Sequence, residues 1–197
     1  MSVWICPHNV CCLAGVDEVG RGALAGDVIA AAVILPVNHN IEGLMDSKRL
    51  SANRRKSLYK EIIDVGGNFA IGHSSAREID DRNILKATLT AMKRAVDALA
   101  IRPDYVVVDG DHLPSWTYRS EAIVGGDNLV SSISAASVIA KVTRDHHMIL
   151  YDSLYPGYDF ISNKGYGTAT HIEALAAFGP TPIHRFSFAP LKDKIGL

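Results

Sequence analysis

Two apolar segments follow one another near the start of the chain, and the first of them carries two adjacent acids. Leu13–Val19 reads LAGVDEV and residues 28–35 read VIAAAVIL, with the glycine-rich turn GRGALAG between them. Segments of this length and composition predict two consecutive buried strands. Burying the carboxylates of Asp17 and Glu18 costs free energy unless another group compensates their charge. The fold must therefore bring such a group to this strand.

The rest of the chain alternates predicted strands and helices. Further strands are expected over 68–76, 105–110 and 121–127, and helices over 52–66 (N-cap Ser51), 83–100, 128–150 and 170–178. In the second helix one buried stripe is expected, because apolar residues recur at intervals of three and four: Leu85, Leu89, Met92, Val96 and Leu99. This order predicts an α/β fold with a mixed central sheet flanked by helices. No repeat or linker divides residues 1–197, so we expect one domain, with about 1–12 as a lead-in and about 152–197 as a helical C-terminal segment.

The composition excludes several classes of protein. The chain has 197 residues, of which 48% are hydrophobic, so it can bury a complete core. A formal net charge of −1 gives no global attraction to nucleic acid, and a polyanion would have to bind local basic patches such as residues 46–56. No apolar run reaches membrane-spanning length, and the N-terminal residues lack the features of a signal peptide. A cytoplasmic protein without membrane association is expected.

Three cysteines lie within seven residues near the N-terminus, at Cys6, Cys11 and Cys12. An odd number so closely spaced is a poor basis for disulfides, and we expect free thiols. A soft metal site that includes His8 is the alternative.

Four acids share a position at or near the end of a predicted apolar strand: Asp17, Glu18, Asp109 and Asp127. Ligands of α/β sheets collect at strand ends, so these carboxylates are expected to converge. Two hard cations, Mg²⁺ or Mn²⁺, would relieve their repulsion and could activate water for hydrolysis of a phosphodiester. Helix capping by Asp127 and a turn at Asp109 are the structural alternatives.

Five motifs occur in the order typical of type 2 ribonucleases H. They are GVDEVGRGALAGDVIAAAVIL, LMDSKRLS, VVVDGD, GGDNLVSSISAASVIAKVTRD and NKGYGTATHI. On these motifs, the region from Leu13 to about Pro190 closely resembles the ribonuclease HII family of bacteria. The resemblance implies a ribonuclease H-like fold whose small helical C-terminal part completes the substrate cleft.

The resemblance also implies an activity and a site. The activity is metal-dependent hydrolysis of the RNA strand of RNA/DNA hybrids, with nicking of duplex DNA on the 5′ side of embedded ribonucleotides to leave 3′-hydroxyl and 5′-phosphate ends. Family members act in ribonucleotide and RNA primer removal. The four acids are implied as catalytic metal ligands. Substrate binding falls to the GRG triplet, a tyrosine at the RNA–DNA junction and a lysine near substrate phosphate: Gly20, Arg21, Gly22, Tyr166 and Lys48.

The GRG triplet makes chemical sense for this substrate. Only a 2′-hydroxyl marks a ribonucleotide in DNA, and backbone amides and carbonyls can bind it where no side chain blocks their approach. Two positions depart from the family pattern. Ala23 replaces a proline, which is expected to loosen the turn, and Gly125 replaces a lysine, which removes a phosphate contact.

Other functions stay open at the level of sequence. A structure-specific DNA nuclease of the same fold type would share the carboxylates but needs no 2′-hydroxyl recognition. A metal-independent ribonuclease would use histidines, although no convergent pair is evident among His112, His146, His147 and His184. A non-catalytic hybrid-binding protein would not need four acids. Ribonuclease HIII carries an extra N-terminal domain, for which the few residues before Leu13 leave no room. We expect a monomer, and core packing rather than a replication clamp for the aromatic residues of segment 185–197.

Overall fold

The computed structural model describes residues 4–44 and 50–195, which form a five-stranded mixed sheet with the order β3-β2-β1-β4-β5. The strands are β1 (Leu13–Val19), β2 (Val28–Ile34), β3 (Asn68–Ser74), β4 (Tyr105–Asp109) and β5 (Ser120–Ile123). The first three pair antiparallel, whereas β4 lies parallel to β1 and β5 lies parallel to β4. The helices are α1 (Ala52–Asp64), α2 (Ala76–Arg82), α3 (Ile84–Asp97), α4 (Ser131–Leu154), α5 (Phe160–Asn163), α6 (Ala169–Phe178) and α7 (Leu191–Ile195), with a short 3₁₀ helix, η2 (Gly126–Asn128).

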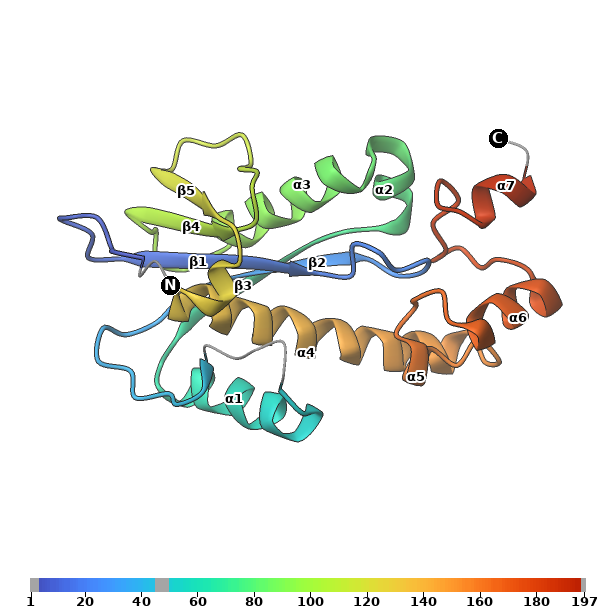
Figure 1. The fold of residues 1–197 in the computed structure, drawn as a ribbon, viewed down its shortest axis with the longest axis horizontal. Coiled ribbons are helices and arrows are strands. Elements are labelled where there is room, and N and C mark those ends of the chain that lie inside the picture. The colour runs from blue at the N-terminus through green and yellow to red at the C-terminus, as the bar shows by residue number, and fades with distance from the viewer. Residues whose placement is uncertain (1–3, 45–49, 196–197) are drawn as a thin grey trace.

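Helices cover both faces of the sheet (Figure 1). Helices α2 and α3 lie on one face, and the long α4, with α1 outside it, lies on the other. Helices α5, α6 and α7 gather beyond the end of the sheet where β1 turns into β2. The predicted helix-flanked mixed sheet is confirmed. None of the helices in the described ranges is both long and apolar enough to cross a bilayer.

Successive side chains along the central strands point to opposite faces of the sheet, so that each face has its own hydrophobic core. Every residue of β2 is buried; Ala30 packs on the α3 side, and Ala31 packs on the α4 side. Small residues let the helices approach closely. A Cβ at Gly15 would lie 2.2 Å from the backbone nitrogen of Ile133 in α4, and one at Gly72 would lie 2.0 Å from the carbonyl oxygen of Ala91 in α3. A side chain at either glycine would push a helix off the sheet.

The structure corrects the predicted strand over 121–127. Strand β5 ends at Ile123, Gly125 adopts a left-handed conformation with φ of 70°, and η2 follows. Asp127 therefore lies on a 3₁₀ turn rather than at the end of a strand. Helix α4 begins at Ser131, three residues later than expected, because the chain must first return to the sheet through η2.

The predicted buried stripe of α3 is only partly right. Its buried face consists of Ala87, Thr88, Ala91, Met92, Ala95 and Val96. Leu85 and Leu89 are half-buried instead, since the close contact with β3 selects small side chains at the sheet. Both leucines line a small pocket that also contains carboxylates, described below.

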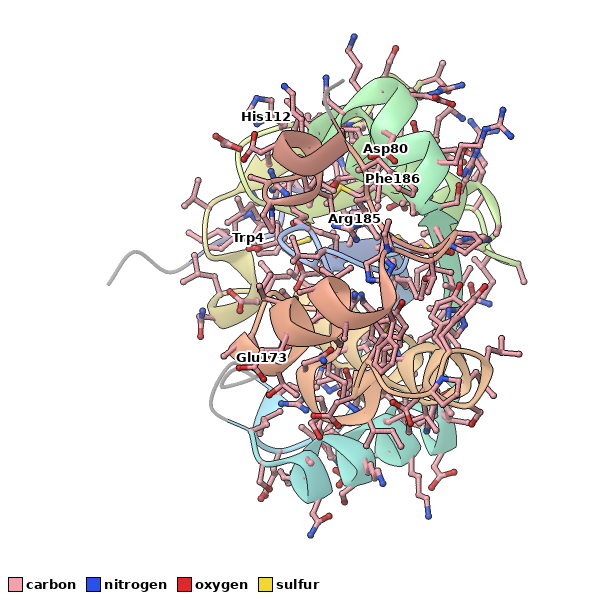
Figure 2. The ribbon with its side chains drawn as sticks, turned by 90° about the vertical axis from the view of Figure 1, so that its right-hand side faces the viewer. Trp4, Asp80, His112, Glu173, Arg185 and Phe186 are labelled. Atoms are coloured by element: carbon pink, nitrogen blue, oxygen red, sulfur yellow. The ribbon has the colours of Figure 1, made fainter. Side chains whose placement is uncertain are left out.

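Helix α2 was not anticipated, although its sequence carries a recognisable signal. Ser75 and Glu78 form a reciprocal capping box at its N-terminus. The carboxylate of Asp80 on this helix then accepts hydrogen bonds from the backbone N–H groups of Phe186 and Ser187 and from the Ser187 hydroxyl. Figure 2 shows Asp80 beside Phe186, with Arg185 next along the same segment. Helix α2 thus fixes the C-terminal segment against the sheet.

Candidate active site

The pleat of β1 sends its two adjacent acids to opposite faces of the sheet. Asp17 shares a face with Gly15, which packs against α4, and Glu18 shares a face with Val16, which packs in the α3 core. Asp17 is 7% exposed, and its Oδ1 accepts a hydrogen bond of 2.7 Å from the backbone N–H of Glu18. Both acids are therefore held at the end of a strand whose interior is otherwise apolar.

Asp109 ends the neighbouring parallel strand. The β1–β4 ladder ends with Val16 paired to Val108, so the next step along both strands brings Asp17 beside Asp109. Asp109 also lines the small pocket next to Glu18. On η2, the backbone N–H of Asp127 donates to Asp109 Oδ1 at 3.4 Å. The buried carboxylate of Asp127 accepts from Asn128 Nδ2 at 2.8 Å.

The electrostatics of this cluster are unfavourable for the carboxylates by themselves. Burial raises the pKa of Asp17 well above its ordinary value, and the charges of Glu18 and Asp109 raise it further. Burial also raises the pKa of Glu18, and Arg21, whose Nη1 lies 3.3 Å from Glu18 Oε1, opposes that shift. The structure thus brings three of the predicted acids into electrostatic contact and places the backbone of the fourth against Asp109.

The donor set fits a hard divalent cation. In residues 4–44 and 50–195, no three Asp, Glu, His or Cys side chains are arranged to hold a metal ion on their own, as a closed coordination shell would. Mg²⁺ does not require one, since it usually keeps several waters and shares ligation with substrate phosphates. An open group of mutually repelling carboxylates is suited to this kind of ion, and a bound cation would lower the pKa of each acid that it touches.

The raised pKa of Asp17 gives a prediction for stability in metal-free buffer. Asp17→Asn should raise Tm near neutral pH, because the variant no longer buries a carboxylate that its neighbours repel. For a chain of this size, each 1 kcal/mol gained in the free energy of unfolding raises Tm by roughly 2–4 °C. Because the pKa of Asp17 is raised in the folded state, its contribution to the free energy of unfolding is fully favourable below the ordinary pKa of about 3.9 and is lost as pH rises. The Tm advantage of Asp17→Asn should therefore shrink as pH falls toward about 4. Thermal melts with chelator test this, with exposed Asp64→Asn as the control. Identical melting of Asp17→Asn and the parent chain would contradict the described cluster.

The turn after β1 is held by a buried arginine. Arg185 donates from Nη2 to the carbonyl oxygen of Gly20 at 2.7 Å, from Nη1 to that of Arg21 at 2.8 Å, and from Nε to that of Gly26 at 3.0 Å. Its side chain is fully buried. Burial and the charge of Arg144 lower the pKa of Arg185 to about 9. This value is still above neutral pH, so the guanidinium stays charged. The GRG backbone is therefore held in position by hydrogen bonds from the buried side of the turn.

A second buried arginine joins this turn to the loop that carries Tyr166. Arg144 donates to the carbonyl oxygens of Ala25 (3.0 Å) and Lys164 (2.7 Å), and its guanidinium carbon lies 5.5 Å from the centre of the Tyr166 ring. A Cβ on Gly20 would lie 2.2 Å from Arg144 Nε, and Gly20 has φ of 91°. Glycine is thus required at position 20 by both conformation and space.

Backbone hydrogen bonds complete the connection between the two loops. The N–H groups of Leu24 and Ala25 both donate to the carbonyl oxygen of Gly165, at 2.7 and 3.2 Å. Tyr166 itself is 36% exposed. Two segments about 145 positions apart in the sequence therefore present the GRG backbone and the Tyr166 side chain in fixed relation. The sequence analysis did not point to Arg144 or Arg185. Arg185 lies in the largely uncharged stretch TPIHRFSFAP, whereas Arg144 lies among other polar and charged residues in KVTRDHHM and carries no such signal.

The two departures from the family pattern have clear local settings. The backbone N–H of buried Ala23 donates to the carbonyl oxygen of Gly20 at 3.4 Å, a bond that proline cannot make. A Cβ at Gly125 would meet open space. The predicted phosphate contact, Lys48, lies outside the described residues.

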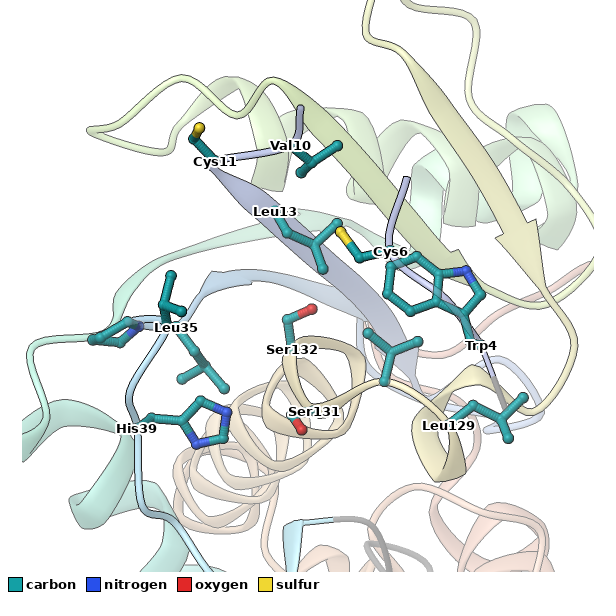
Figure 3. A pocket seen from close by; sticks show the side chains of 13 residues that line it. Trp4, Cys6, Val10, Cys11, Leu13, Leu35, His39, Leu129, Ser131 and Ser132 are labelled. Carbon is teal, nitrogen blue, oxygen red and sulfur yellow. The ribbon is translucent and has the colours of Figure 1, made fainter. Parts of the chain in front are cut away.

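Another cavity, of ≈ 370 Å³, lies away from these residues (Figure 3). It is formed by the N-terminal lead-in and the starts of β1 and α4, and none of the four acids lines it. Ser132 Oγ there is buried without a hydrogen-bond partner in the described structure. Cys6 and Cys11 border the cavity, and no disulfide joins any of the three cysteines.

Comparison with solved structures identifies the class of protein. The fold superimposes on the ribonuclease H2 of Pyrococcus horikoshii OT3 with a TM-score of 0.77 and 27% identity, over 92% of this chain and 96% of that one. It also matches ribonuclease HIII from Bst, solved in complex with Mn²⁺, with a TM-score of 0.69 and 19% identity over 94% of this chain and 69% of that one. The fold is that of the ribonucleases H.

The sequence comparisons are more specific. The family model described as Ribonuclease HII matches residues 14–191. The ribonuclease HII of Coxiella burnetii (strain Dugway 5J108-111) is 53% identical over 187 residues, which are 95% of this chain and 92% of that protein. The chain therefore belongs to the ribonuclease HII family, whose members are hydrolases that cleave RNA in RNA/DNA hybrids. The predicted family, fold class and enzyme class are confirmed.

Proposed function

We propose that this chain cuts the RNA strand of hybrids and nicks duplex DNA on the 5′ side of an embedded ribonucleotide, leaving 3′-hydroxyl and 5′-phosphate ends. The proposed metal ligands are Asp17, Glu18, Asp109 and Asp127. The observation that carries the proposal is the position of the GRG turn, which follows directly on the strand that carries Asp17 and Glu18. Arg185 holds this turn by donating hydrogen bonds to the carbonyl oxygens of Gly20 and Arg21. The pairing of Arg21 with Glu18 connects the two parts of the site.

Gly22 supports recognition of a sugar by the backbone. It is exposed, it has no left-handed φ, and a Cβ built on it would meet nothing within 4 Å. Neither packing nor backbone conformation explains glycine at this position. A ligand that must approach the main chain does explain it, and a ribose 2′-hydroxyl can both donate to and accept from backbone groups.

The carboxylates would hold Mg²⁺ or Mn²⁺, which when bound supplies charge for the attacking water and the leaving oxygen of the phosphodiester. The protein residues position the substrate around that centre. The GRG backbone contacts the ribonucleotide, the Tyr166 ring lies against the following deoxyribonucleotide, and Lys48 is proposed near phosphate.

A nicking assay tests the proposal. The substrate is duplex DNA with one embedded ribonucleotide, compared with an all-DNA duplex, in Mg²⁺, in Mn²⁺ and with EDTA. Cleavage of the ribonucleotide duplex alone, abolished by EDTA, is the expected result. Cleavage of both duplexes would favour a DNA nuclease of the same fold, and activity that survives EDTA would favour a metal-independent mechanism.

The role of Tyr166 gives a second prediction. Tyr166→Ala should cut nicking at an isolated ribonucleotide by roughly ten- to a hundredfold, about 1.4–2.8 kcal/mol in the transition state, because stacking on a sugar or base is worth about 1–3 kcal/mol. Cleavage within a long RNA strand should fall less, since the ring faces the DNA side of the junction. Tm should change little because the side chain is partly exposed. Equal losses on both substrates would contradict a role at the junction.

Partners beyond nucleic acid have a weaker structural basis. A ribonuclease HII from Archaeoglobus fulgidus has been solved in complex with PCNA, and it shares this fold with a TM-score of 0.69 and 23% identity over 90% of this chain and 95% of that one. In this chain Phe188 packs against two core clusters and lies 5.2 Å from the guanidinium of Arg185. Phe188 therefore contributes to core packing in this chain. As a separate point, we propose a monomer as the active form.

A further inference from the structure

Two histidines that the proposed chemistry does not use lie in direct contact behind the Tyr166 loop. His171 in the first turn of α6 and His184 before the C-terminal segment have their Nε2 atoms 3.0 Å apart. Both side chains are essentially fully buried. No convergent histidine pair was evident from the sequence, since 13 positions separate the two residues and His171 lies in the NKGYGTATHI motif whereas His184 lies outside it.

The backbone groups at the two ends of this pair determine where its protons are. The N–H of Thr181 donates to His184 Nδ1 at 2.9 Å, so that nitrogen must carry a lone pair. The other nitrogen of a neutral His184 then carries hydrogen and donates to His171 Nε2. His171 in turn must carry hydrogen on Nδ1, which lies 2.9 Å from the carbonyl oxygen of Tyr166, a group that can only accept. Both ends lead independently to the same tautomers.

The surroundings keep both imidazoles neutral. Phe160 lies edge-on to His171 at 5.3 Å, and the Tyr158 ring lies 5.4 Å from His184. Burial and the neighbouring His171 lower the pKa of His184 to about 4, and burial lowers the pKa of His171. A second proton on His184 Nδ1 would break the hydrogen bond from the Thr181 N–H and would leave the Thr181 hydroxyl, 2.9 Å away, as its acceptor.

We propose that His184 and His171 form a hydrogen-bonded relay that positions Tyr166 for recognition of a ribonucleotide, and that both are positioning residues rather than catalytic ones. This inference rests on the proposed function of Tyr166. His184 is followed directly by Arg185, which holds the carbonyls of Gly20 and Arg21. The adjacent residues His184 and Arg185 therefore connect to both parts of the proposed substrate site. His184 reaches the Tyr166 loop through His171, and Arg185 holds the GRG backbone.

A double-mutant cycle tests the relay. His171→Phe keeps a ring of similar shape and removes the hydrogen bond to the Tyr166 carbonyl. It should lower nicking at an isolated ribonucleotide by roughly three- to tenfold, the effect of losing one net hydrogen bond, with a smaller effect on cleavage within continuous RNA. In the Tyr166→Ala background the same change should cost less than about twofold, because the residue being positioned is already absent. An equal loss in both backgrounds would overturn the proposal.

A matched pair at the other histidine tests the direction of the relay. His184→Gln can place an N–H near the position of Nε2, whereas His184→Leu has similar volume and no donor. The glutamine variant should keep more of its preference for an isolated ribonucleotide over continuous RNA than the leucine variant. Equal preference in the two variants would contradict a donor role for His184.

Nitrogen-15 NMR of the unmutated protein provides a measurement that does not depend on how the variants fold. At neutral pH, His171 should appear as the Nδ1–H tautomer and His184 as the Nε2–H tautomer, both neutral. A charged imidazole or the opposite tautomer at either residue would overturn the relay. A parent protein that fails to nick at a ribonucleotide would instead contradict the proposed function, so the two failures are distinguishable.

Discussion

Asp109→Asn should lower hydrolysis of both hybrid and single-ribonucleotide substrates by roughly a thousandfold or more in saturating Mg²⁺, about 4 kcal/mol in the transition state. Asparagine occupies nearly the same volume but removes the charge that a hard cation requires. Asp109 also lies where the other acids meet, beside Asp17 across the β1–β4 ladder and under the backbone N–H of Asp127. Loss of its charge therefore affects the whole cluster rather than one ligand.

Asp64→Asn is the control, because this exposed carboxylate ends α1 and lies outside the acid cluster. It should retain activity near that of the parent chain. Thermal melts add a test that does not involve turnover: Mg²⁺ should raise the Tm of the parent chain and of Asp64→Asn, but much less that of Asp109→Asn. Activity of Asp109→Asn near the parent rate would remove this residue from the proposed metal centre.

Arg185→Met should be the most destabilising of these substitutions, and it should also reduce the selectivity of nicking. The variant leaves the carbonyls of Gly20, Arg21 and Gly26 without their buried donor. Removing one member of a buried hydrogen-bonded charge network costs about 3–5 kcal/mol. At roughly 2–4 °C per kcal/mol for a chain of this size, Tm should fall by about 6–20 °C.

The functional part of this prediction is measured below the melting transition. With the GRG backbone released, the ratio of nicking at an isolated ribonucleotide to cleavage of continuous RNA should fall by about tenfold, equivalent to 1.4 kcal/mol. Arg77→Met, on the exposed face of α2, removes an arginine of the same length and should change neither Tm nor selectivity. A stable Arg185→Met protein with unchanged selectivity would show that the turn holds its conformation without this arginine.

Local patterns predicted the elements and the acids well, because those features depend on residues close in the chain. The apolar runs around Asp17, Glu18 and Asp109 led to β1 with the boundaries observed and to β4 within one residue, and Ser51 caps α1 as expected. The prediction failed at Asp127, since a glycine pair can either continue a strand or turn out of it. In the structure Gly125 takes the left-handed conformation and turns the chain into η2.

The sequence by itself determined the fold class through the order of its strands and helices, and the family through its five motifs. It also marked the chemically unusual acids, because burying two adjacent carboxylates in an apolar strand admits few explanations. What only the tertiary structure decided is how the two halves of the proposed site are held together. Arg144 and Arg185 donate to backbone groups far away in the sequence, and His171 and His184 meet through their side chains across 13 positions, so local spacing does not reveal these contacts. Their roles arise because buried polar groups must find partners, and only the folded chain determines which partners are within reach.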